Sequence, residues 1–228
     1  GPDQLSLFGL DTQNKEKLEF HINTINVVSK FLENIGVEQR LVNKFLQADG
    51  SVVKGALAAA NFLEGTVDII EDFKKRPDAW NKLPEEAAHW WYRLLDQNSP
   101  LKKALWESHK TALKRDELYK TQYGKLVSKP EDLTEEAIGQ IIAESIKRIE
   151  ERNGSKEDYS FFKKFLEWIN KILSIFKSTQ QDPFEVAAMK ILASDTTDIP
   201  LTFTEHKALN DEVYFGSVVD HQSTAPID

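Results

Sequence analysis

The chain contains no cysteine in its 228 residues. Disulfides, zinc ribbons and cysteine nucleophiles are therefore excluded, and any metal ion must be bound by carboxylates and imidazoles. Positive charge is also scarce, because 29 Lys and Arg stand against 37 Asp and Glu, which gives a net charge of -8. Nucleic-acid binders need clustered basic residues to neutralise phosphates, so we expect no nucleic-acid partner.

Long apolar runs are missing as well. Crossing a bilayer takes about 20 predominantly apolar residues, and the sequence has no such run. The first residues carry neither a basic segment nor the apolar core of a signal peptide. We therefore expect a soluble protein with no membrane partner, located in the cytoplasm. Gly1 and Pro2 resemble the remnant of a cleaved purification tag, which indicates a domain excised from a longer chain.

The sequence does contain 40% hydrophobic and 29% charged residues, which is typical of a compact globular domain. We expect a tag remnant and flexible N-terminus at 1–14, a single domain at 15–193, and an extended or disordered tail at 194–228. Apolar residues that recur every three or four positions predict a predominantly helical α+β fold. The expected helices cover 15–33, 84–95, 101–119, 135–152, 156–177 and 184–192, with a short one at 37–47.

Strand signals lie between residues 49 and 71. Asp49-Gly50 is a turn dipeptide typical of hairpins, and short segments rich in Val, Ile and small residues follow at 51–61 and 65–71. These segments predict a small β-hairpin or sheet packed against the helices. Residues 65–71 form the stronger of the two strands, and we expect them at an edge of the sheet.

One run, LPEEAAHWW, carries a candidate site. Glu85 and His89 lie four positions apart, so a helix places both on one face, where they can share a metal ion. Glu86 stands beside them as a candidate general base for water. Glu136, on the separate helix at 135–152, could supply a third ligand. Ordinary helix chemistry is the alternative, because acidic residues favour a first turn and a lone histidine often binds only a backbone carbonyl.

Aromatic residues follow the candidate site directly. Trp90, Trp91 and Tyr92 are expected to pack in the core, because aromatic side chains bury large areas in helical domains. Tyr92, Tyr119 and Tyr123 are all candidates for stabilising an oxyanion, and the sequence does not choose among them. The remaining histidines lack ligand-type partners at helical spacing and are expected at the surface; they are His21, His109, His206 and His221.

Three segments, TVDIIED, EEAAH and EEAIGQIIA, follow one another within residues 50–151. This order of strand, motif helix and distal helix resembles the small zincin metallopeptidases of the ImmA/IrrE-like and phage polyvalent-protein kind. The resemblance implies a zincin-like core at 50–151, with Glu85, His89 and Glu136 as metal ligands and Glu86 as the general base. It also implies a peptide or protein substrate, which we expect to align along the edge segment 65–71. The implied parent is a polyprotein of a phage or mobile element, located in the host cytoplasm or in a phage particle.

Glu85 stands where the zincin motif has its first histidine. A carboxylate in that place adds a negative charge and a hard oxygen ligand to the site. Manganese and iron are therefore expected as the divalent metal alongside zinc, which is less favoured by such a ligand set. Two functions stay open: a metal-dependent peptidase, and a noncatalytic helical module that binds a partner through the Phe-rich helix at 159–176. A di-iron bundle ranks below both, because the E-x-x-H pattern occurs only once.

Overall fold

The computed structural model describes residues 19–46, 49–53, 56–70, 77–121, 130–152, 163–164, 166–171 and 181–209. Over these residues the fold is α+β and predominantly helical, which confirms the expected fold class. The helices are α2 (Ile22–Asn34), the 3-10 helix η3 (Pro77–Lys82), α3 (Leu83–Leu94), α4 (Pro100–Glu107), α5 (His109–Tyr119), α7 (Pro130–Arg152), α9 (Pro183–Leu192) and α10 (Phe203–Leu209). None of the described helices is both long enough and apolar enough to cross a membrane.

A three-stranded sheet forms one layer of the fold. Its strands are β1 (Glu38–Val42), β4 (Ala58–Asn61) and β5 (Thr66–Ile70), in the order β1-β5-β4. β5 runs parallel to β1 and antiparallel to β4. The β4–β5 connection ends at Gly65, whose φ of 76° favours a residue without a Cβ. β5 is thus paired on both sides, so the expectation that residues 65–71 offer a free edge to a peptide is wrong.

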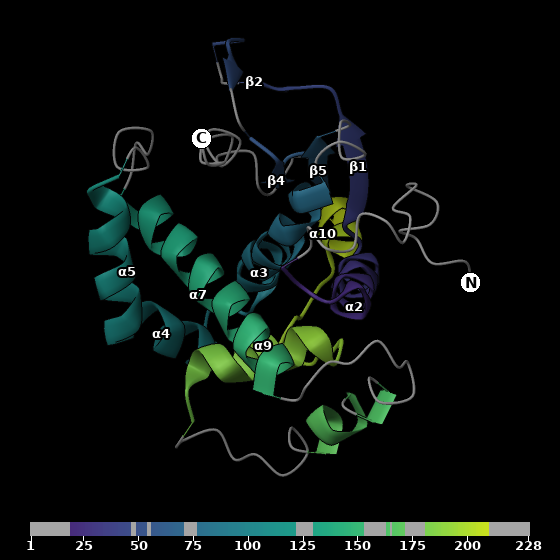
Figure 1. Ribbon diagram of the computed structural model, residues 1–228, viewed down its shortest axis with the longest axis vertical. Coiled ribbons are helices and arrows are strands. Elements are labelled where there is room, and N and C mark those ends of the chain that lie inside the picture. The colour runs from purple at the N-terminus through teal and green to yellow at the C-terminus, as the bar shows by residue number, and fades with distance from the viewer. Residues whose placement is uncertain are drawn as a thin grey trace.

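A second, two-stranded hairpin projects from this sheet at the top of Figure 1. β2 (Phe45–Leu46) and β3 (Val52–Val53) pair antiparallel. The turn includes Gly50 with a φ of 83°, which is the hairpin that the Asp49-Gly50 dipeptide predicts. Phe45 and Val53 turn inward against Ala59 of the main sheet.

α3 is the central helix of the domain. It packs against α7 and α2 and against strand β4, and Figure 1 shows α3 and α7 side by side, with α5 outside α7 and α2 beyond α3. Its two tryptophans, Trp90 and Trp91, are fully buried in the main hydrophobic core. This confirms that they pack in the core, in one cluster with apolar residues of α7 such as Ile138 and Ile142.

The short helix expected at 37–47 is wrong, because this segment forms β1 and β2. A strand depends on partners that are distant in the chain, and helical spacing in an 11-residue segment gives no sign of them. Here Arg40 on β1 pairs with Asp68 on β5 through two hydrogen bonds of 3.0 and 2.9 Å. This buried carboxylate of β5 therefore holds β1 in register.

The boundaries of two helices also differ from expectation. The segment 101–119 is two helices, because Ser108 adopts extended backbone angles and its hydroxyl accepts a hydrogen bond from Lys110 N, which starts α5. α7 begins at Pro130, five residues before the expected start at residue 135. The expected helix at 156–177 is described only at 163–164 and 166–171, which are helical, and the rest of it lies outside the described residues.

The described part of the segment after Ser194 is not the extended tail expected from its composition, because residues 203–209 form α10. Phe203 is 7% exposed and its ring packs edge-on against Trp90, with ring centroids 5.3 Å apart. Its backbone N–H donates to the carbonyl of Ile35. Burial of this aromatic ring stabilises the packing of the segment against the core. The mostly polar composition of the segment does not predict this contact. Residues 210–228 lie outside the described part.

Candidate metal centre

The first turn of α3 lies inside the protein. η3 leads directly into α3, with Pro84 in the first turn. Glu85 and Glu86 are 9% and 7% exposed, whereas acidic residues that merely complement a helix dipole remain in solvent. Burial of two adjacent carboxyl groups costs free energy unless partners are provided, so their surroundings decide what they do.

Three side chains from two helices converge at this point. Nε2 of His89 lies 3.9 Å from Oε1 of Glu85, one turn earlier on α3, and 3.3 Å from Oε2 of Glu136 on α7. His89 and Glu136 are 5% and 2% exposed. One ligand atom from each of the three residues lies within 4.8 Å of the other two, so the group could hold a metal ion.

The spacing of these atoms fits a divalent cation. Ligands at about 2.1 Å from one ion stand roughly 3.0–3.5 Å apart when they are neighbours in a tetrahedron or octahedron. The 3.3 Å between His89 and Glu136 lies in this range, whereas Glu85, at 3.9 Å from His89 and within 4.8 Å of Glu136, would have to move inward. The second oxygen of Glu85, Oε2, lies 3.8 Å from Nζ of Lys82, so this cation partly neutralises the carboxylate from outside.

Sequence reasoning missed Gly139, which lies one turn after Glu136. A Cβ built on Gly139 would come within 2.9 Å of Nε2 of His89 and closer still to Nδ1 and Cε1 of the same ring. The imidazole therefore rests directly on the backbone of α7. The available signal was the glycine itself, because an interior helix glycine costs about 1 kcal/mol relative to alanine and indicates a packing reason.

Gln140 is a second residue that sequence reasoning missed. Its Nε2 donates a 3.0 Å hydrogen bond to Oε1 of Glu136. Since Oε1 is occupied in this way, Oε2 is the oxygen that faces His89. Gln140 thus orients the carboxylate toward the centre, as partners of metal ligands commonly do.

Electrostatics give His89 and Glu136 opposite charges. Burial alone would lower the pKa of His89, but the carboxylates of Glu136 and Glu85 outweigh it and raise this pKa well above 6.5. Burial alone would raise the pKa of Glu136, but the charge and hydrogen bond of His89 lower it to about 2. The pair is therefore an imidazolium and a carboxylate around neutral pH. Burial raises the pKa of the third member, Glu85.

Glu86 lies next to the three converging residues, and its carboxyl group reaches strand β4 of the sheet. Its Oε2 accepts a 2.6 Å hydrogen bond from the backbone N–H of Ala60 on β4. The carbonyl of Leu57 accepts a hydrogen bond from the backbone N–H of Ile70 across the hairpin, so the backbone groups of Leu57 face β5. Successive residues of a strand direct their N–H groups to alternate sides, so those of Ala58 and Ala60 point away from β5. Glu86 thus lies at the edge of β4 that faces away from β5, where Ala58 and Ala60 are themselves buried. Burial raises its pKa to about 8.

The other candidates differ in their positions. Tyr92 is buried and lies under the ammonium group of Lys102, 4.9 Å from the ring centre, whereas Tyr119 is 71% exposed and Tyr123 lies outside the described residues. Of the other histidines, His109 is exposed, while His21 and His206 are half-buried and His221 is outside the described part. His21 accepts from Asn23 N as the cap of α2. The structure thus brings together the three expected ligands, with Glu86 beside them.

Comparisons with known proteins do not extend this description. No protein-family model matches the chain, and neither the curated proteins nor the solved structures contain a match to it. The geometry of these side chains is therefore the basis for assigning a function.

Proposed function

We propose that this chain is a metal-dependent peptidase domain of the zincin type, with Glu85, His89 and Glu136 as ligands. One observation supports it: three ligand-type side chains from α3 and α7 converge in the protein interior, where charged groups are costly unless they have a purpose or a partner. The resemblance to phage polyvalent proteins supports a parent protein of phage or mobile-element origin. A divalent cation would supply Lewis-acid chemistry, polarising a peptide carbonyl and acidifying water.

The ligand set favours manganese(II) or iron(II) over zinc(II). Two of its three members are carboxylates, and hard oxygen ligands suit manganese and iron better than the histidine-rich sets typical of zinc. Lys82 beside Glu85 and Gln140 beside Glu136 hold the two carboxylates in place from outside. Metal binding requires His89 to present a neutral Nε2, so its proton leaves as the ion enters.

Glu86 is the proposed general base. Its Oε2 is occupied by the N–H of Ala60, which leaves Oε1 to accept a proton from the attacking water and to pass it to the leaving amine. Because Glu86 lies at the edge of β4 that faces away from β5, we propose that the scissile peptide binds beside that edge, in place of the expected alignment along β5. An extended peptide can add to such an edge through its main chain.

A noncatalytic scaffold is the second candidate, and a specific observation favours it. Each acidic member of the group has a partner within the protein, since Glu136 pairs with His89, Glu85 with Lys82, and Glu86 with Ala60. Such a set could serve only to fasten α3 to α7 and to the sheet. The domain would then bind a peptide or protein partner without cleaving it.

Metal content separates the two candidates. We would prepare metal-free protein, add manganese(II), iron(II) or zinc(II), and measure binding by calorimetry for the original chain, for Glu136→Gln and for the matched control Glu144→Gln. Glu144 lies on α7 but is half exposed and pairs with Lys114 outside the centre. Binding that Glu136→Gln abolishes and Glu144→Gln preserves would support the enzyme. Failure of all three ions to bind would exclude it.

Peptide cleavage is the second test. Protein loaded with the tightest-binding ion would be incubated with a peptide mixture, and products identified by mass spectrometry. We expect Glu86→Gln to retain the ion and lose cleavage. Cleavage that survives this substitution would show that Glu86 is not the base, whereas bound metal without any cleavage would support the scaffold.

A further inference from the structure

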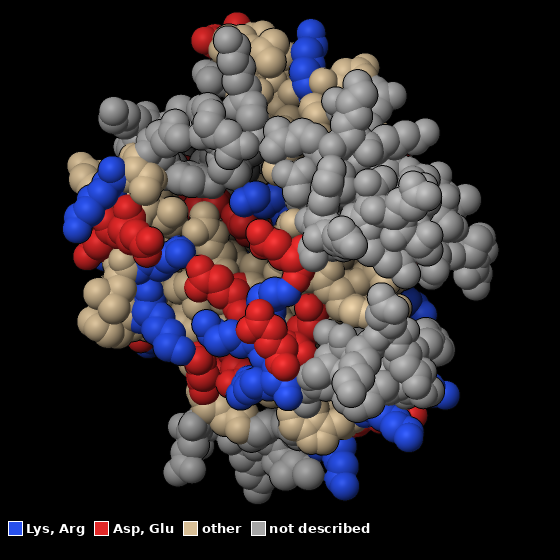
Figure 2. Space-filling model, in the orientation of Figure 1, with Lys and Arg blue, Asp and Glu red and all other residues tan. Residues whose placement is uncertain are grey.

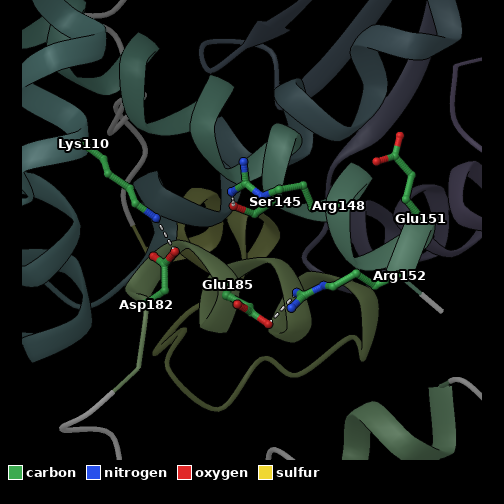
Figure 3. A pocket seen from close by; sticks show the side chains of 7 residues that line it. All are labelled: Lys110, Ser145, Arg148, Glu151, Arg152, Asp182 and Glu185. Carbon is green, nitrogen blue, oxygen red and sulfur yellow. Dashed lines mark hydrogen bonds and ion pairs between the residues drawn. The ribbon is translucent and has the colours of Figure 1, made fainter.

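A second polar site lies on the opposite side of α7 from the metal centre. It is a surface cavity of about 270 Å³, bounded by the start of α5, the second half of α7 and the start of α9, and lined by Lys110, Ser145, Arg148, Glu151, Arg152, Asp182 and Glu185 (Figure 3). Ser145 follows Glu136 by about two and a half turns, so their side chains leave α7 on opposite sides. The cavity is therefore separate from the proposed ligands.

Two of the three cations that line the cavity are neutralised by carboxylates of α9. Lys110 on α5 reaches Asp182, which caps the start of α9. Arg152, near the end of α7, lies 2.7 Å from Glu185. Figure 3 shows both cations extending across the cavity toward α9. These two ion pairs form the walls of the cavity and add no net charge to it.

Arg148 is bound differently. Its Nη2 donates a 2.9 Å hydrogen bond to Oγ of Ser145. Among the described residues, no carboxylate oxygen lies within 4.0 Å of its guanidinium nitrogens, so Arg148 forms no ion pair with them. Ser145 is 2% exposed, and its hydroxyl proton is donated to the carbonyl of Ile141. A lone pair of Oγ therefore faces Arg148 and holds the guanidinium in place, while its other N–H groups remain available for a ligand.

The geometry and charge favour one class of ligand. We propose that this cavity binds a carboxylate through Arg148. A guanidinium presents parallel N–H groups that match the two oxygens of a carboxylate. A phosphate dianion fits less well, because the single positive charge of Arg148 does not balance its second negative charge. Glu151 also lines the cavity, and Figure 3 shows it directed away from the other side chains.

The size of the cavity limits the ligand. A volume of about 270 Å³ lies just below the usual range for small-molecule sites, which begins near 300 Å³. It suits a carboxylate with a few attached carbons, such as an acidic side chain of a bound peptide or a small free carboxylic acid. The surrounding face, where acidic and basic side chains interleave over α7 and α9 (Figure 2), is open to either source.

Binding can be followed at the arginine itself. We would record the Nε–Hε signal of Arg148 by NMR at low ionic strength while adding sodium acetate, inorganic phosphate, and two capped tripeptides, Gly-Glu-Gly and Gly-Gln-Gly. The variants would be Arg148→Gln and the control Arg115→Gln, an exposed arginine on α5 that does not line the cavity. For the variants, binding would be measured from backbone amide shifts around Ser145 and Glu185.

We expect acetate and the Glu peptide to shift the Arg148 signal, whereas the Gln peptide should leave it unchanged. Arg148→Gln should weaken binding about tenfold or more, and Arg115→Gln by less than about twofold, since one charged hydrogen-bond donor is worth at least that factor. A Glu peptide that binds more tightly than acetate would identify a protein side chain as the source. Equal binding by both variants, or tighter binding of phosphate than of acetate, would overturn the proposal.

Discussion

Nε2 of His89 on α3 lies 3.3 Å from Oε2 of Glu136 on α7, and this buried pair joins the two central helices. Both side chains are at most 5% exposed, so solvent screens their attraction little. The same contact therefore serves two roles: it holds the helices together, and it contains two of the three proposed metal ligands. The predictions below separate these roles.

Metal affinity should rise with pH. The pKa of His89 is raised well above 6.5 because the neighbouring carboxylates outweigh its burial, so an entering ion must displace the imidazole proton. We expect affinity to increase by up to about tenfold per pH unit between pH 6 and pH 8, with one proton released per ion. Calorimetry in buffers of different ionisation enthalpy measures this release. Constant affinity over that range would mean that His89 is not a ligand.

Gly139→Ala should harm both the fold and the centre. At an exposed helix position this change stabilises by up to about 1 kcal/mol, but here the new methyl group would overlap the ring of His89. We expect the free energy of unfolding to fall by about 1–3 kcal/mol and metal affinity to fall with it. Glu144→Ala, at a half-exposed position on the same helix, is the control and should change the affinity little. Equal affinity in both variants would contradict the close contact.

Glu86→Gln should alter how stability depends on pH. Burial raises the pKa of Glu86 in the folded chain to about 8, against 4.5 for the free side chain. The folded state therefore binds this proton more tightly, and the free energy of unfolding falls as the pH rises from about 4.5 to 8. Glutamine cannot ionise and still accepts from Ala60. We expect it to stabilise the protein at pH 8.5 by about 1–3 kcal/mol, measured by urea unfolding, with no gain at pH 4.5.

Phe203→Ala should reveal how firmly the C-terminal helix is docked. The ring lies against Trp90 and over Gly65, where a Cβ would overlap it. Removing a buried phenylalanine ring typically costs 3–5 kcal/mol, and we expect about 3 kcal/mol at this 7% exposed position. Leu209→Ala, on the same helix but 68% exposed, should cost less than about 0.5 kcal/mol. Thermal unfolding of both variants provides the comparison, and equal losses would contradict docking through Phe203.

The parts of the fold that sequence patterns predicted are those set by local periodicity. α3 and α9 begin within a residue of their predicted starts, and the β4–β5 hairpin follows its turn residues. The pairing of Glu85 with His89 on one helix face required only the spacing of four. Glu136 was harder to predict, because its approach to His89 depends on how α3 and α7 pack.

The errors share a different origin. β1 was expected as a helix because the strand depends on β5, whose Asp68 lies 28 positions from Arg40. α10 was expected as a tail because its single buried ring, Phe203, finds its site against Trp90, more than 100 positions earlier. In each case the stabilising contact is distant in the chain, and local composition does not include it.

The sequence by itself determined which chemical groups are present: carboxylates and an imidazole at helical spacing, and no thiol. Tertiary structure alone decided their protonation. Both residues are glutamates in helices, yet burial raises the pKa of Glu86 to about 8, whereas pairing with His89 lowers the pKa of Glu136 to about 2. The reason is physical, because the free energy of a charge depends on the water removed from it and on the charges brought near it. Only the packing of α3 against α7 and β4 sets those two quantities.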